Sequence, residues 1–95
     1  MQVEYTIDAF ASLTSLVNFI ESKNTRGAGL RWLNEYEKFL NQAFANAEKR
    51  KICRNATFKK FKLRCIYFKD WLIAFSIHDN SVVIEAILHK SRVTD

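Results

Sequence analysis

Nine lysine and arginine side chains gather in one middle stretch of the chain, Lys49 to Lys69, with no acidic residue between them. Residues 1–48 carry four cations and six acids, and residues 70–95 carry two cations and four acids. A protein that needs charge only for solubility intersperses the two signs. The segregation therefore predicts an anionic partner, either a polyanion or an acidic protein segment. The candidate contacts are Lys49, Arg50, Lys51, Arg54, Lys59 and Lys60.

Two histidines and two cysteines are the other side chains that could carry chemistry. Histidine exchanges a proton near neutral pH, so His78 and His89 are candidates for acid–base work; the alternative for each is a strand-end residue with a structural hydrogen bond. Cys53 and Cys65 lie twelve positions apart, without enough further ligands nearby for a metal site. We expect two reduced thiols, no metal and no cofactor.

Strands that could position these residues are indicated by alternation of apolar and polar side chains in four places. Turn residues at Lys69-Asp70 and Asp79-Asn80 separate the last three strands, which are predicted to form an antiparallel meander. The predicted strands cover residues 3–7, 61–67, 71–78 and 82–89.

Two helices are predicted between the first and second strands, because apolar residues recur there at helical spacing. The first helix is expected to begin with Asp8 as its cap and to end near Lys23. The second is expected to begin with Thr25 as its cap and to end near Ala47. The predicted fold is α+β in the order β-α-α-β-β-β, a small antiparallel-rich sheet with a helical hairpin on one face. At 95 residues the chain makes one domain, 1–95.

The predicted sheet leaves one face uncovered. Phe61, Leu63, Cys65 and Tyr67 are expected beneath the hairpin, so that Lys62 would project from the open face. Small residues flanked by cations and histidines predict a shallow binding groove there. The groove would be lined by Lys62, Arg64, Ala74, Ser76, His78, Glu85 and His89.

The order of elements and three segments resemble the RelE/ParE superfamily of bacterial type II toxin–antitoxin systems. The segments are EYTIDAFASL, GAGLRWLNEYEKFL and WLIAFSIHDNSVVIEAILHKSR, and the resemblance is strongest from Trp71 to Arg92. It implies a growth-inhibiting, plasmid-stabilising toxin that a cognate antitoxin neutralises with an acidic or amphipathic segment. No signal or membrane-spanning run is seen, so the cytoplasm is the expected compartment.

The resemblance implies one of two activities. RelE-like members are metal-independent endoribonucleases that cut mRNA on the ribosome, and ParE-like members poison DNA gyrase. A nuclease needs a base, an acid and cations around the phosphate. Arg64, His89 and Lys62 fall in the matching regions as catalytic candidates, with Lys59 and Arg92 as further contacts.

The C-terminal ending departs from the RNA-cleaving pattern. Several such relatives end with a histidine–tyrosine pair or a late tyrosine, whereas here His89 is followed by Lys90 and no aromatic residue follows Phe75. The ending His-x-x-Arg is more similar to ParE-like sequences. Trp32 and Phe39 are expected in the core or in an apolar patch for an antitoxin or a second protomer. The alternative function is a small basic nucleic-acid-binding module without toxicity.

Overall fold

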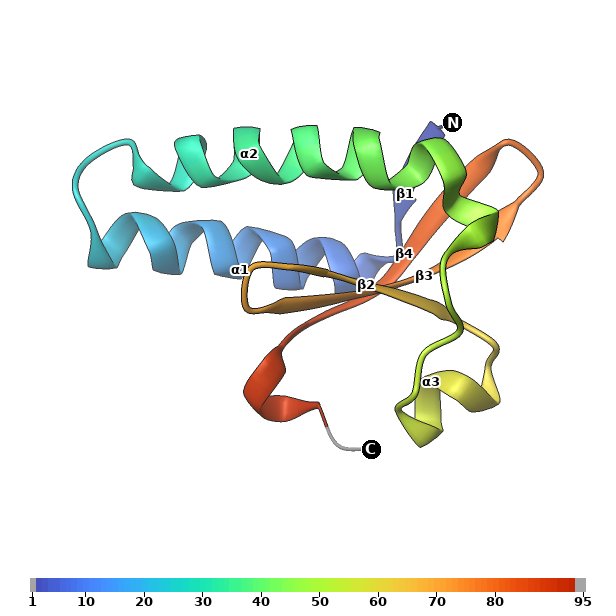
Figure 1. The fold of residues 1–95 in the computed structure, drawn as a ribbon. Coiled ribbons are helices and arrows are strands. Elements are labelled where there is room, and N and C mark those ends of the chain that lie inside the picture. The colour runs from blue at the N-terminus through green and yellow to red at the C-terminus, as the bar shows by residue number, and fades with distance from the viewer. Residues whose placement is uncertain (1, 94–95) are drawn as a thin grey trace.

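The computed structural model describes residues 2–93. Four strands form one sheet in the order β1-β4-β3-β2 (Figure 1). The elements are β1 (Gln2–Tyr5), α1 (Ile7–Lys23), α2 (Ala28–Ala43), η1 (Phe44–Lys49), α3 (Ala56–Lys60), β2 (Arg64–Phe68), β3 (Trp71–His78), β4 (Ser81–His89) and η2 (Lys90–Arg92). The predicted α+β class and the meander of the last three strands are confirmed. β1 joins the sheet in parallel beside β4, and α3 is a short helix that the sequence did not reveal.

The helical hairpin depends on two glycines and one carboxylate. Gly27 has a φ of 88° and begins α2, so the cap expected at Thr25 is wrong. An added Cβ at Gly29 would come within 2.8 Å of the Val17 carbonyl oxygen, which shows how closely α1 and α2 approach. The Glu21 carboxylate accepts hydrogen bonds from the backbone N–H groups of Gly27 and Gly29 at 2.8 and 2.9 Å. These two bonds hold the pKa of Glu21 below its usual value.

The start of α1 also differs from the prediction. Thr6 has the extended backbone of a cap residue, and its hydroxyl accepts from the Ala9 N–H at 3.1 Å. Asp8 lies instead within the first turn, where a negative charge favours the helix dipole. The first strand therefore ends before Ile7, whose side chain is 89% exposed.

One large core fills the space between the hairpin and the sheet. Trp32 and Tyr36 of α2 stack with ring centroids 5.2 Å apart, and both meet the edge or face of Phe68 from β2. Phe39 packs on the same ring at 5.2 Å. Trp32 is buried and Phe39 half-buried, so they belong to the core, and the alternative of an apolar patch for a partner is wrong. The Tyr5 and Tyr36 hydroxyls share a hydrogen bond of 2.9 Å, and burial raises the pKa of Tyr36.

The side-chain phase predicted for β2 is wrong. Ile66 and Phe68 face the large core, whereas Tyr67 is 55% exposed on the other side of the strand. The reason is that α3 and a turn at Lys62, with φ of 57°, remove residues 61–63 from the strand. β2 therefore begins at Arg64 and runs in the opposite phase. A shift of one residue moves every side chain to the other face.

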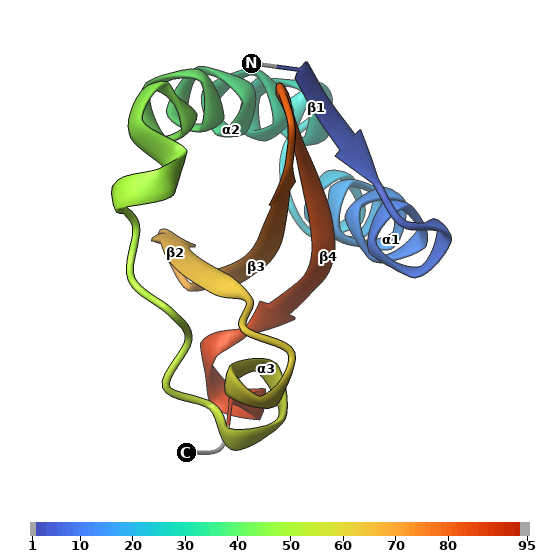
Figure 2. The same ribbon diagram turned by 90° about the vertical axis from the view of Figure 1, so that its right-hand side faces the viewer.

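The second face of the sheet carries a smaller core. Cys53, Leu63 and Ala74 are buried together, with Phe58, Cys65 and Ala86 packed against them. Figures 1 and 2 show the hairpin on one side of the sheet and α3 on the other. The face expected to be open is thus partly covered by the chain that connects η1 to β2. No helix within residues 2–93 has the length and apolar character to cross a membrane.

Candidate partner-binding surface

The cationic segment, which we define as residues 49–64, crosses the second face of the sheet before it enters β2 (Figure 2). Asn55 begins α3, and its side-chain oxygen accepts from the Phe58 N–H at 3.1 Å. The buried Cys53 and Leu63 attach the segment to Ala74 of β3. Phe58 packs beside them, whereas Ile52 and Phe61 are exposed together with the charged side chains. The exposed cations of the segment are Lys49, Arg50, Lys51, Arg54, Lys59, Lys60 and Lys62.

Cys53 and Cys65 form a disulfide, so the expectation of two reduced thiols is wrong. Residues on either side of each cysteine pair like antiparallel strands: the Cys53 N–H donates to the Leu63 carbonyl at 2.8 Å and the Cys65 N–H donates to the Lys51 carbonyl at 3.1 Å. This pairing brings the two Cα atoms to 4.9 Å, within the range that a disulfide spans. The bond closes the cationic segment into a loop fixed to the edge of β2.

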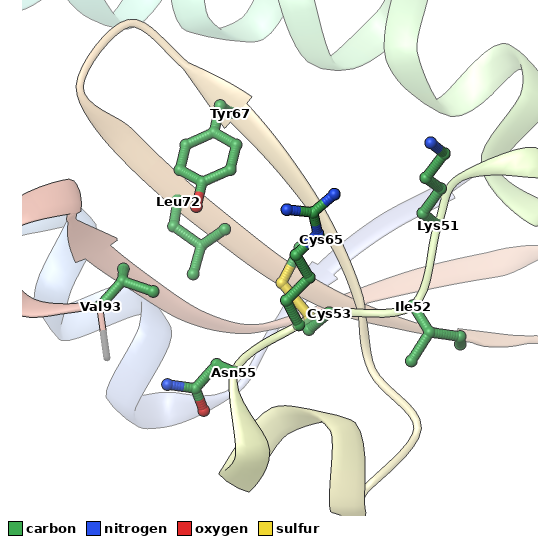
Figure 3. Close-up of a pocket in the computed structure, with 9 residues that line it drawn as sticks. Lys51, Ile52, Cys53, Asn55, Cys65, Tyr67, Leu72 and Val93 are labelled. Atoms are coloured by element: carbon green, nitrogen blue, oxygen red, sulfur yellow. A yellow bond between two sulfur atoms is a disulfide. The ribbon is translucent and has the colours of Figure 1, made fainter. Parts of the chain in front are cut away.

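A pocket lies beside the disulfide (Figure 3). Lys51 and Arg54 contribute positive charge to it, and Asn55 and Tyr67 contribute an amide and an exposed aromatic ring with a hydroxyl. Its apolar wall comes from the disulfide, Leu72 and Val93. A cavity with cations at its rim and an aromatic side chain suits an anionic or phosphate-bearing group.

Arg64 and Arg50 are used to fix the chain. The Arg50 Nε donates to the Ala43 carbonyl at 3.1 Å, which satisfies an open carbonyl at the end of α2. Arg64 pairs in register with Phe75, whose side chain is in the large core, so Arg64 starts on the helix-bearing face. Its Nη1 donates to the Arg50 carbonyl at 2.5 Å. The placement of Arg64 on an open face is therefore wrong.

His89 also lies on the helix-bearing side. Its ring meets the edge of Trp71 with centroids 5.1 Å apart. Its Nδ1 accepts from the Ser91 N–H at 3.2 Å, which caps η2. This agrees with the alternative of a strand-end histidine in a structural hydrogen bond. Arg92 is exposed and lines the same groove as His89.

The three catalytic candidates do not come together. Arg64 of β2 pairs with Phe75 of β3, which pairs in turn with Ile84 of β4, so Arg64 and Ile84 lie at the same level of the sheet. His89 lies five residues farther along β4, which is roughly 16 Å at about 3.3 Å per residue. Lys62 lies outside the strand, in the turn before it. One phosphate group cannot contact Arg64 and His89 at the same time in this arrangement.

The second face does gather three residues of the predicted groove. The Ser76 hydroxyl is 2.8 Å from Glu85 Oε2 and 3.0 Å from His78 Nε2. These residues line a second pocket, on the far side of α3 from the disulfide, together with Phe58 and the exposed Phe61. Phe61 and Tyr67 lie on the surface, although the alternation in the sequence predicts both beneath the hairpin. Within residues 2–93 no cluster of three or more His, Cys, Asp or Glu side chains is suited to a metal ion.

An apolar groove runs on the other side of the molecule, between α1 and the end of β4. Leu16 and Phe19 of α1 form one wall, and Trp71 and Ile87 lie opposite. Phe19 is 53% exposed, and Phe10, about two and a half helical turns earlier in α1, is 58% exposed. The groove is open to an apolar partner segment, and Arg92 adds one positive charge to its lining.

The sequence matches a known family model, and the fold is similar to a solved structure. Residues 3–94 match the family model described as the ParE toxin of the type II toxin–antitoxin system parDE. The fold is similar to a solved structure, the chromosomal ParDE toxin–antitoxin system from P. aeruginosa, with a TM-score of 0.70. That match has 13% sequence identity and covers 94% of this chain and 95% of the other. No curated protein sequence matches the chain.

Proposed function

The chain belongs to the ParE toxin family of type II toxin–antitoxin systems, and from this premise we propose that it inhibits growth by binding DNA gyrase rather than by cutting mRNA. It is a toxin, and an antitoxin is its partner. The proposal concerns its molecular target.

The observation that carries the proposal is the separation of Arg64 from His89. Cleavage of RNA by attack of the 2′-hydroxyl requires a base, an acid and a cation around one phosphate. Arg64 donates to the Arg50 backbone, and His89 accepts from the Ser91 backbone. Both side chains thus have structural partners, and His89 lies at the end of β4 whereas Arg64 is level with its middle. A protein that acts by binding needs no such constellation, and this supports the gyrase target.

We propose the cationic segment as the surface that meets the target, with Lys51, Arg54, Lys59 and Lys60 as the main contacts. These side chains are exposed and lie on a segment that the disulfide attaches to the sheet. An acidic antitoxin segment would compete for the same charges, and this would explain neutralisation by simple occlusion. Its amphipathic part would fit the apolar groove between α1 and β4. Gyrase and ribosomes are both cytoplasmic, so the toxin would act in that compartment.

The test is to induce the toxin without antitoxin and to follow DNA damage and mRNA in the same culture. We expect the DNA-damage response to rise while bulk mRNA stays intact. Purified toxin is expected to inhibit supercoiling by purified gyrase. Rapid loss of mRNA and arrest of translation, with no DNA damage, would overturn the proposal in favour of the nuclease.

Two sets of variants sharpen this test. His89→Ala is expected to keep its toxicity, whereas a catalytic histidine would lose activity by orders of magnitude. Lys51→Glu with Arg54→Glu should relieve toxicity and weaken antitoxin binding together. The matched control is Arg26→Glu with Lys38→Glu, which reverses two exposed charges on the hairpin. If the control relieves toxicity as much as the test pair does, only net charge matters and the surface is misassigned.

A second copy of the chain is the other occupant to test at the α1 groove. Phe10 and Phe19 are exposed on α1, and a second copy could cover them as an antitoxin helix would. Sedimentation of the free toxin distinguishes the two occupants. We propose the antitoxin, and we expect the free toxin to sediment as a monomer and the complex to protect Phe19 from solvent.

A further inference from the structure

The pocket on the second face between α3 and the strands combines groups that the toxin role does not use. It measures about 490 Å³ and is open to solvent beside the cationic segment. Its aromatic wall is Phe61, which is 67% exposed although a phenyl ring gains nothing from water. Its polar wall is the hydrogen-bonded set of Ser76, His78 and Glu85.

A β-bulge positions Glu85. The register of β3 and β4 shifts between Ala74 and Phe75, whose partners are Ala86 and Ile84. Glu85 is therefore the extra residue of β4, and both Glu85 and Ala86 line the pocket. Bulges frequently re-aim a side chain at a binding site. The carboxylate is thus held by the backbone of two paired strands and not by a mobile loop.

Glu85 carries a negative charge beside a segment rich in cations, yet it has no ion pair. Among residues 2–93 the ion pairs are Lys69 with Glu35 and Lys90 with Asp70. Glu85 Oε2 accepts from the Ser76 hydroxyl, and no hydrogen bond from the described residues reaches Oε1. Because Glu85 lines the pocket, a ligand there with N–H donors would satisfy its remaining acceptor capacity.

We propose that this pocket binds a guanine base of single-stranded nucleic acid. The Watson–Crick edge of guanine presents two adjacent N–H donors, which match a carboxylate in bidentate fashion, whereas adenine, cytosine and uracil each lack that pair. The base stacks on Phe61, and aromatic stacking of this kind tolerates any base, so Glu85 supplies the selectivity.

Charge beside the pocket supports a nucleotide over a free base. Lys60 and Lys62 flank Phe61 in the chain, and Lys59 comes directly before Lys60. All three lysines are exposed. Cations at this spacing suit the phosphates on either side of a stacked base. On the same face, Tyr67 provides a second exposed aromatic ring in the pocket with Lys51 and Arg54. A strand of a few nucleotides could then reach from one pocket to the other across α3.

The test measures binding of fluorescent uridine oligonucleotides that carry one central guanosine, adenosine, cytidine or uridine to the free toxin. We expect the guanosine oligonucleotide to bind roughly tenfold more tightly than the others. Deoxyribose versions distinguish DNA from RNA as the natural source of the base. Equal affinity for the four central bases would overturn the guanine assignment. No gyrase is present, so failure here leaves the proposed function intact, and failure of the gyrase test leaves this site intact.

Two variants separate stacking from base selection. Phe61→Ala should weaken binding of all four oligonucleotides about tenfold, because the base loses its stacking surface. Phe10→Ala removes an exposed aromatic ring from α1 and is the matched control. Glu85→Gln should abolish the preference for guanosine and leave the other three affinities unchanged or slightly higher. Glu48→Gln removes the same charge from an exposed position in η1 as its control. A Glu85→Gln protein that still prefers guanosine, or a Phe61→Ala protein that binds normally, would refute the site.

Discussion

The two faces of the sheet are built in different ways. The hairpin face buries a continuous set of large apolar side chains, among them Tyr36, Phe75 and Ile84, each at most 1% exposed. The second face buries a smaller set, Cys53, Leu63, Leu72 and Ala74, beneath a segment that carries exposed cations and a disulfide. Burial stabilises the first face, whereas a covalent bond and a few contacts fix the second. The comparison indicates that the hairpin face is the scaffold and that the second face is available for partners.

The largest expected effect comes from making the same substitution on the two faces. Phe75→Ala should lower the free energy of unfolding by about 3–5 kcal/mol, because it leaves a cavity in the large core. Phe61→Ala should change it by less than about 0.5 kcal/mol, since that ring is mostly exposed. Urea unfolding followed by tryptophan fluorescence measures both. Similar losses in the two variants would show that the second face is also part of the folding core.

Reduction of the Cys53–Cys65 disulfide is expected to have the next largest effect. A disulfide that closes a loop of this length stabilises the folded protein by about 2–3 kcal/mol, because it lowers the conformational entropy of the unfolded chain. Hydrogen exchange should accelerate in residues 50–63 and stay slow in α1 and α2, because the hairpin face does not depend on the bond. The double variant Cys53→Ser with Cys65→Ser should show the same exchange with or without reductant. Uniform acceleration over the whole chain would contradict the division into two faces.

Gly29→Ala tests the tight packing within the scaffold. The added methyl group would meet the Val17 carbonyl oxygen and the Glu21 side chain, so α1 and α2 must move apart. We expect a loss of about 1–3 kcal/mol, measured by thermal unfolding, with the disulfide and oligonucleotide binding unchanged. Leu30→Ala, at an exposed position of the same helix, should be nearly neutral.

Acid titration gives the smallest effect and concerns the hairpin turn. The Gly27 and Gly29 N–H groups lower the pKa of Glu21 from its usual 4.5. The carboxylate therefore stabilises the folded chain above pH 4.5, and this contribution is lost below 4.5 as pH falls through the lowered pKa of the folded state. Glu21→Gln should therefore lower the melting temperature at pH 7, and its difference from the unmodified protein should shrink below pH 4.5. Glu48→Gln serves as the control. A difference that persists unchanged at low pH would argue against this role of the carboxylate.

Much of the fold was readable from periodicity. The apolar residues of β3, such as Ile73 and Phe75, and those of the hairpin, such as Leu13 and Tyr36, were correctly placed in the core. These segments are long, and each buries one strongly apolar face, so local spacing reflects their environment. The prediction was wrong for the stretch from Asn55 to Leu63. Its apolar residues pack in a small core on the other side of the sheet, and its five-residue helix is too short to show a helical period.

The candidate site was predicted only in part. Ser76, His78 and Glu85 share the second face as expected, and the cations of the segment are exposed. Arg64 and His89 were placed on that face by counting alternate residues. The turn at Lys62 and the bulge at Glu85 each shift the alternation of side chains between the two faces by one residue. Lysine and glutamate are not residue types that predict a turn or a bulge.

The sequence by itself determined the α+β class, the family resemblance and the concentration of positive charge between Lys49 and Lys69. Composition and spacing are local properties, and they suffice for these conclusions. Only the tertiary structure decided that Cys53 meets Cys65, that Lys69 pairs with Glu35 on the hairpin, and that Phe61 and Glu85 line one pocket. These contacts depend on where the chain turns and in which register its strands pair, and one residue of register reverses the face that a side chain occupies.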